Sequence, residues 1–291
     1  MSVSQQHPGH ALRSTSEGVL RLMFGIFLAA IAVGLAVWAD PLPYVMVTML
    51  MILFAAREWH RMVRSPTQRE IADRQPIHVQ TAITAVAIAC AVAALFFRVL
   101  PLAFLLLAAG TVASFEWARR RNDNPFWHAA GVIYLGVPAL ALVGLRVLPA
   151  QGTLIVLGLF LIVWATDTGA LVFGKLIGGK KIAPRLSPGK TWAGTIGGSI
   201  TASMVFGLYI AFISFNVLQA MLFAFLFSFV AHGGDLFESL VKRRFGFKDS
   251  GGLIPGHGGV LDRVDSLFAA SVALALLVFG LHFNPMFGGR V

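Results

Sequence analysis

The sequence predicts an all-α, polytopic integral membrane protein with about nine transmembrane helices. Of its 291 residues, 57% are hydrophobic and only 12% are charged, and the mean hydropathy is +0.78. Apolar runs recur along the whole chain, and a helix needs ~20 such residues to cross the ~30 Å hydrocarbon core of a bilayer. The basic residues gather in alternate loops, which is typical of membrane proteins with several spans.

The apolar runs give the predicted helices in order. The first follows a polar segment without the basic-then-apolar order of a cleaved signal peptide, so we interpret it as a retained span. The second run is short, and the fourth directly follows the third. The nine predicted spans are 18–39, 41–56, 78–98, 99–117, 126–148, 151–172, 192–214, 216–236 and 264–283.

The positions of the basic residues indicate an orientation. If the N-terminus is cytoplasmic, the loops on that side contain 20 of the 23 Lys and Arg residues, and only Arg98, Arg146 and Arg290 fall on the other side. Because Lys and Arg are enriched in cytoplasmic loops, we expect a multi-pass protein of the cell inner (plasma) membrane. The cytoplasmic segments would be 1–21, 57–77, 116–125, 165–191 and 232–263.

The net charge and the cysteine content exclude two kinds of site. A net charge of +10 in so apolar a chain predicts anionic membrane lipids or phosphates as partners, and no nucleic acid. Cys90 is the single cysteine, so an intramolecular disulfide and a zinc site built on thiolates are both excluded.

Two similar segments end predicted spans on the cytoplasmic side. They are "REWHR" at 57–61 and "FEWAR" at 115–119. Tryptophan and flanking charges are common where a helix leaves the membrane. We therefore interpret both segments as interfacial belts without a role in substrate binding.

The segment "HGGDLFESLVKRR" at 232–244 places polar groups on one helix face. Residues three and four apart share a face, which would be acidic at one end and basic at the other. A carboxylate at the membrane edge usually has a partner or a metal; for Asp235 the alternative is a structural ion pair with a neighbouring arginine. The residues that share this face are Asp235, Glu238, Ser239 and Lys242.

The segment "HGGVLDRVDS" at 257–266 contains two carboxylates one helical turn apart. Asp262 and Asp265 would lie at the start of the last span, where a helix N-terminus favours negative charge. Oxygen ligands of this kind suit magnesium. Glycines such as Gly258 and Gly259 allow the backbone to approach phosphate closely. His257 could donate to phosphate, act as a general acid or base, or be a structural group.

The segment 167–194 combines an acidic residue with several basic ones. Asp167 ends a span, and "PGKT" at 188–191 only partly resembles a P-loop, whose glycine spacing is absent. The alternative is a basic loop that merely follows the positive-inside rule. The polar residues that follow Asp167 are Lys175, Lys180, Lys181, Arg185, Ser187, Lys190 and Thr191. The three segments together predict a phosphoryl or nucleotidyl transfer site at a lipid surface.

The stretch "SLVKRRFGFKDSGGLIPGHGGVLDRVD" at 239–265 resembles the signature of the phosphatidate cytidylyltransferase family. The resemblance extends upstream through "GDLFES", "DTGALVFGK" and "SPGKTWAG" and covers about the C-terminal 45% of the chain. Two positions depart from the family pattern: Gly189 stands where a lysine is usual, and Ala193 where a glutamate is usual. The eleven matching positions are Ser239, Lys242, Arg243, Lys248, Asp249, His257, Gly258, Gly259, Asp262, Arg263 and Asp265.

The resemblance implies that CTP and phosphatidic acid react to give CDP-diacylglycerol and pyrophosphate with Mg²⁺, a second cation being left open. Residues 1–150 would then contain spans for lipid access, and 151–291 the catalytic motifs, within one membrane domain. The number of chains per assembly is also left open, with a homodimer as one option. We expect Asp235, Asp262 and Asp265 to hold the metal. Charge on the phosphates would be offset by Lys242, Arg243, Lys248 and Arg263, and phosphate oxygens would be bound by Ser187, Lys190, Thr191 and Ser239.

Two other functions fit the same residues. A CTP-dependent lipid or polyprenol kinase would transfer the γ-phosphate and release CDP. An ion-coupled transporter would use Asp167, Asp235 and Asp265 as an ion path. The transporter is disfavoured because the polar groups gather near loops at one membrane face and do not recur at mid-span.

Overall fold

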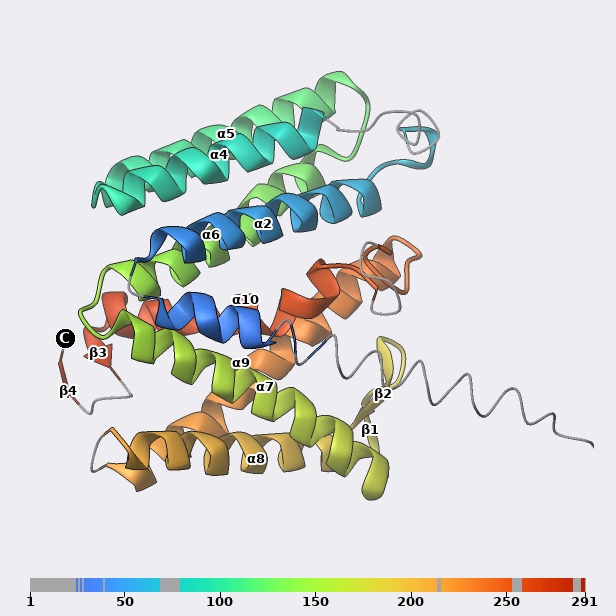
Figure 1. The fold of residues 1–291 in the computed structure, drawn as a ribbon. Coiled ribbons are helices and arrows are strands. Elements are labelled where there is room, and N and C mark those ends of the chain that lie inside the picture. Colours follow the sequence, from blue (N-terminus) through green and yellow to red (C-terminus); the bar gives the residue numbers. More distant parts are fainter. Residues whose placement is uncertain are drawn as a thin grey trace, which may run out of the picture.

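The structure is a computed structural model that describes residues 25, 27, 29–38, 40–68, 79–213, 216–252, 258–284 and 289–290. Within these residues, eight helices are long and apolar enough to cross a membrane, and they form the bundle in Figure 1. They correspond to the last eight predicted spans, which confirms a polytopic, mostly helical membrane protein. Of the first predicted span, 18–39, the structure describes residues 25, 27 and 29–38, and all of these except residue 38 are helical.

The helix boundaries follow local signals in the sequence. Proline occupies one of the first two positions of three helices, where its missing N–H costs no hydrogen bond. The helices are α2 (Leu42–Met62), α4 (Val79–Phe96), α5 (Leu100–Arg120), α6 (Pro125–Val147), α7 (Gly152–Leu176), α8 (Trp192–Ala211), α9 (Val217–Arg244) and α10 (Leu261–Ala275), which continues as a π-helical turn over Leu276–Gly280.

Two helices extend well beyond their predicted cytoplasmic ends. Helix α2 continues to Met62 and α9 to Arg244, whereas hydropathy placed these ends at 56 and 236. Hydropathy detects only the part of a helix that lies in lipid. The polar continuations still form good helix, and their basic last turns complement the negative end of the helix dipole. Polar side chains therefore lie on rigid helical extensions at this end of the bundle.

The structure contains two short hairpins that the all-α prediction did not include. Strands β1 (Lys181–Ala183) and β2 (Ser187–Thr191) pair antiparallel between α7 and α8, and β3 (Phe283–Asn284) pairs with β4 (Gly289–Arg290). Strands of two to five residues are too short to produce a recognisable period. Strand β2 leads directly into α8, whose first turn is capped by the Thr191 hydroxyl accepting from the Gly194 N–H at 3.0 Å.

Glycines bring α7 and α8 into close contact. A Cβ on Gly198 would lie 2.5 Å from the carbonyl oxygen of Thr166, and one on Gly194 would lie 2.8 Å from that of Ala170. Small residues at such positions let membrane helices pack backbone to backbone. Helix α8 consequently lies along α7, on the side of the bundle away from α4 and α5 (Figure 1), and the hairpin is held beside the end of α7.

The end of α2 is fixed by buried polar contacts. The indole N–H of Trp59 donates to the Trp127 carbonyl at 2.9 Å. The next residue, His60, has Nδ1 2.8 Å from His128 Nδ1 and Nε2 2.7 Å from the Thr84 hydroxyl, and all three of these side chains are fully buried. His128 Nε2 in turn lies 3.0 Å from Asp123 Oδ2. These contacts lock α2 to α4 and α6 at the end where the polar loops lie.

Candidate active site

The start of α10 is organised around Asp262. Lys242, near the end of α9, donates to Asp262 Oδ1 at 2.6 Å. Asp262 Oδ2 accepts from the Ser250 hydroxyl and the Ser250 and Gly259 amides, each at 2.9 Å. Because these donors come from the loop between the two helices, the carboxylate holds that loop and both helices together.

A second carboxylate pair lies deeper, between α9 and α10. Glu238 is fully buried, and its Oε1 lies 3.3 Å from the Lys242 ammonium. Its side chain also interacts with that of the buried Asp265. Two buried carboxylates that face each other disfavour being charged together. This pair is therefore stabilised by a proton or a cation, and Lys242 supplies one positive charge.

The hairpin contributes a lysine to the same end of α9. Lys190 on β2 forms an ion pair with Asp235. The Ser239 hydroxyl, one turn further along α9, lies 3.4 Å from Asp235 Oδ1. The sequence alone also allows a structural ion pair between Asp235 and an arginine. In the structure the partner is Lys190, from the segment expected to bind phosphate.

Asp167 links α7 to these groups. Its side chain is exposed on the last third of α7 and lies within electrostatic range of Asp235, Asp265, Lys190 and Arg263. Four elements that are far apart in the sequence, α7, β2, α9 and α10, thus place charged side chains at one end of the bundle.

Sequence reasoning missed Glu58. This residue of α2 is 6% exposed, and its carboxylate accepts from the amides of Val260 and Leu261 at 3.0 and 2.8 Å and from the Ser250 hydroxyl at 3.1 Å. Glu58 belongs to the segment "REWHR", whose charged and aromatic residues we interpret from the sequence alone as an interfacial belt. Its counterpart Glu116 forms an exposed i,i+3 bridge with Arg119.

The other predicted site residues lie around this cluster. Arg243 is exposed and donates to the Leu186 carbonyl in the hairpin at 3.3 Å. Lys248, Asp249 and Arg263 are exposed, and Ser187 is half-buried on β2. Gly258 has a φ of +81°, which favours glycine. His257 lies outside the described residues.

Comparison with known families shows the family of this chain. The model of the Cytidylyltransferase family matches residues 19–281, which is most of the chain. This chain belongs to the cytidylyltransferase family.

Several cytidylyltransferases are similar to it in sequence. The phosphatidate cytidylyltransferase of Brucella suis is 44% identical over 190 residues, which cover 63% of this chain and 66% of that protein. The protein of the same name from Rickettsia bellii is 37% identical over 186 residues, covering 61% and 79%. That from Haemophilus influenzae is 44% identical over 128 residues, covering 42% and 44%. The chain thus spans just under two thirds of the Brucella relative.

The acidic side chains of this site suit a metal ion that is completed by other ligands. No three histidine, cysteine or acidic side chains in the described part of the chain already lie at metal-binding spacing, so the three predicted aspartates do not form a ready-made cage there. Mg²⁺ usually takes one or two carboxylates together with substrate phosphates and water. Asp235 and Asp265 supply such oxygens, and the buried carboxylate of Glu238 beside Asp265 adds negative charge that favours a cation. The residues therefore fit a magnesium ion completed by the nucleotide.

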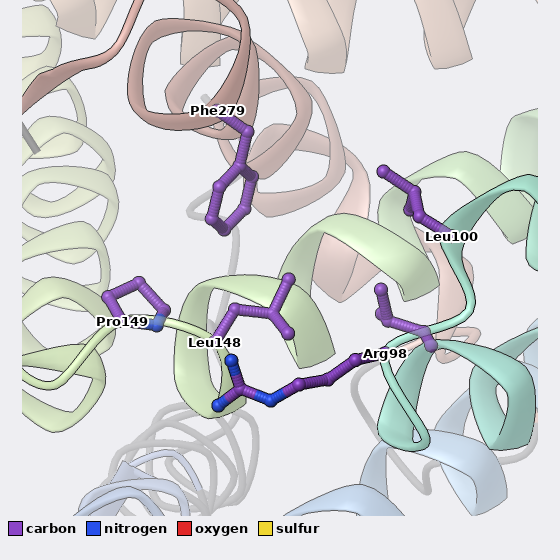
Figure 2. Close-up of a pocket in the computed structure, with 6 residues that line it drawn as sticks. Arg98, Leu100, Leu148, Pro149 and Phe279 are labelled. Atoms are coloured by element: carbon purple, nitrogen blue, oxygen red, sulfur yellow. The ribbon is translucent and has the colours of Figure 1, made fainter.

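An apolar pocket lies far from this cluster. It is lined by Arg98, Leu100, Leu148, Pro149 and Phe279, among others, and Figure 2 shows these side chains around the turns that join α4 to α5 and α6 to α7. These turns lie at the opposite ends of the helices from the charged cluster. The pocket therefore plays no part in the candidate active site.

Proposed function

We propose that this protein transfers the cytidylyl group of CTP to phosphatidic acid, releasing pyrophosphate. The observation that carries the proposal is the gathering of Asp167, Lys190, Asp235 and Asp265 from separate elements, in a chain of the cytidylyltransferase family. The relatives named phosphatidate cytidylyltransferase support the choice of substrates.

The reaction needs charge neutralisation and alignment more than it needs a protein nucleophile. A phosphate oxygen of phosphatidic acid bonds to the α-phosphorus of CTP, and the bond from that phosphorus to the departing pyrophosphate oxygen breaks. A phosphate monoester is largely ionised at neutral pH, so the lipid itself supplies the nucleophile.

Two partly buried lysines hold the phosphates in this scheme. Lys190 pairs with Asp235 and Lys242 with Asp262, and the two lysines are 21% and 12% exposed. Their ammonium groups can exchange a carboxylate partner for a phosphate oxygen. The exposed Arg243, Lys248 and Arg263 surround the cluster and offset the charge that develops on the leaving pyrophosphate.

The acidic residues take two roles. Asp235 and Asp265 would bind Mg²⁺, which neutralises phosphate charge and orients the triphosphate when it is bound. Asp262 positions the loop and the Lys242 ammonium through its four short hydrogen bonds. Ser239, which lies 3.4 Å from Asp235, and Ser187 on the hairpin would donate to phosphate oxygens, and Thr191 keeps the hairpin joined to α8.

Two CTP samples, each labelled at a different phosphate, test the reaction. The purified protein is incubated in detergent with phosphatidic acid, Mg²⁺ and CTP labelled at either the α- or the γ-phosphate. Label from the α-position should enter the lipid, and label from the γ-position should leave as pyrophosphate. Entry of γ-label into lipid would show a kinase, and absence of both would reject lipid substrates of this kind.

We also infer that the site faces the cytoplasm, because the loops at this end carry most of the basic residues. Two single-cysteine variants are made in a Cys90→Ala background. Gly252→Cys reports on the end of the bundle with the charged cluster, and Gln151→Cys reports on the opposite end. A membrane-impermeant maleimide added to intact spheroplasts should label the second and spare the first. The reverse pattern would overturn the orientation.

A further inference from the structure

Helix α10 begins without a cap of its own. Its N-cap residue is Val260, which offers no side-chain acceptor. The first amides of a helix have no partner inside the helix and are usually satisfied by a side chain of the preceding residues. Here the acceptor comes from about 200 positions earlier in the sequence, because Glu58 on α2 accepts from the amides of Val260 and Leu261.

Two glycines leave room for this carboxylate. A Cβ on Gly251 would lie 2.5 Å from Glu58 Oε1, and a Cβ on Gly259 would lie 2.5 Å from Glu58 Oε2. Both glycines belong to the loop between α9 and α10. Their hydrogen side chains allow the loop to close over Glu58, so part of the glycine content of this loop fits a protein carboxylate.

The contacts of Glu58 continue directly into the candidate site. The Ser250 hydroxyl lies 3.1 Å from Glu58 Oε2 and 2.9 Å from Asp262 Oδ2. Asp262 holds Lys242, and Asp265 follows one turn later on the same helix. The position of α10, and with it both aspartates, therefore depends on an acceptor at the end of α2.

We propose that Glu58 is a positioning residue for cytidylyl transfer: it caps α10 from α2 and sets the geometry of Asp262 and Asp265 without touching substrate. The proposal rests on the proposed function for its kinetic part. Its structural part, the anchoring of the loop by Glu58, stands independently of any activity.

A carboxylate satisfies both helix amides that face it. The Val260 amide donates to Glu58 Oε1 and the Leu261 amide to Oε2, and the Ser250 hydroxyl lies between Glu58 and Asp262. A glutamine of the same shape would place its NH₂ group against one of the two amides in either orientation. Glu58→Gln consequently keeps the volume and removes an acceptor, which leaves a buried donor unsatisfied.

The test compares Glu58→Gln with Glu116→Gln. The second variant makes the same chemical change in the similar segment of α5, where the carboxylate is exposed and pairs with Arg119. For each protein, folding is checked by monodisperse elution and helix content. Two quantities are then measured: deuterium uptake by the peptide covering 258–262 without substrate, and kcat and KM for CTP.

We expect uptake in Glu58→Gln to be about tenfold faster or more, because hydrogen bonds to a charged acceptor are lost. The kcat should fall by about 10²-fold, as small misplacements in an active site do, with a much smaller change in KM for CTP. Glu116→Gln should match the wild type in both measurements. A loss of folded protein alone would lower the yield and leave the kcat of the folded fraction unchanged.

Wild-type uptake in Glu58→Gln would overturn the anchoring, and faster uptake with wild-type kcat would overturn the positioning role. If wild-type protein shows no cytidylyl transfer, the proposed function fails while uptake still tests the anchoring. Should Glu58→Gln not be recovered folded, Glu58→Asp replaces it. Glu58→Asp keeps the charge but withdraws the carboxylate from the Val260 and Leu261 amides by one methylene, so it should show the same two effects, and wild-type behaviour would overturn the proposal.

Discussion

Lys242 Nζ lies 2.6 Å from Asp262 Oδ1 and joins the last turn of α9 to the first turn of α10. The two side chains are only 12% and 11% exposed, so the pair is less screened by water than a surface bridge. The pair brings the basic end of the segment 232–244 and the acidic residues of the segment 257–266 into the same site.

The first prediction concerns Asp262→Asn. An amide at this position places donors among the Lys242 ammonium, the Ser250 groups and the Gly259 amide, so the loop and the lysine lose their common acceptor. We expect the rate of cytidylyl transfer to fall by ~10² to 10³, with the protein still folded. The rate of transfer of α-label to lipid and the elution profile measure this. Near-normal turnover would refute the role given to Asp262.

The second prediction concerns the metal. Chelation should abolish lipid labelling, and added Mg²⁺ should restore it. Asp265→Asn removes a proposed ligand, so binding of Mn²⁺ in the presence of CTP, followed by its paramagnetic resonance signal, should weaken by about tenfold or more. Asp249→Asn, which changes an exposed acidic residue outside the proposed metal pair, serves as the control. Equal Mn²⁺ affinity in wild type and Asp265→Asn would remove Asp265 from the metal site.

The third prediction concerns acid stability. Burial would raise the pKa of Asp123, but hydrogen bonds from His128 and from the amides of Ser65 and Asn124 outweigh it and hold this pKa below its ordinary value. A lowered pKa in the folded state stabilises above the ordinary pKa of ~3.9, and this stabilisation is lost as the pH falls through the lowered pKa.

Asp123→Asn should accordingly lower the free energy of unfolding by ~1 to 3 kcal/mol at neutral pH. The difference from wild type should shrink at pH values below ~4. Thermal unfolding in detergent across this pH range measures it, with Asp40→Asn as a variant at an exposed carboxylate. A difference that stayed constant down to the lowest pH would contradict the account of Asp123.

The fourth prediction concerns Gly189, where the resemblance to the family signature leads us to expect lysine. This glycine is exposed on β2, and a Cβ there would meet no atom within 4 Å. Gly189→Lys should therefore fold normally and add a cation next to Lys190. Exposed charge pairs contribute ~0.2 to 1 kcal/mol, so KM for CTP should fall by up to about fivefold. Gly189→Gln controls for side-chain size, and an equal effect of both variants would exclude a charge effect.

Much of the fold and part of the site could be predicted from local sequence. The apolar runs located eight helices, and Asp235, Ser239 and Lys242 lie on one helix, α9, as their spacing predicted. The hairpin over 181–191 was missed because its strands are too short for periodicity.

The role of Glu58 could not be predicted, because local sequence does not encode it. "REWHR" and "FEWAR" have the same order of charge and aromatic groups, yet Glu58 is buried against the α10 loop and Glu116 is exposed. The difference comes from which helix packs beside each segment. Contacts between residues about 200 positions apart are decided by tertiary packing.

The central claim, that distant segments act on one substrate in one site, is tested most directly by a double-mutant cycle on Lys190 and Asp235. The kcat/KM for cytidylyl transfer is measured for wild type, Lys190→Met, Asp235→Asn and the double variant. Because the two side chains form an ion pair, the double variant should lose far less than the product of the two single losses. Single losses that simply multiply would show that the hairpin and α9 act independently, contrary to a shared site.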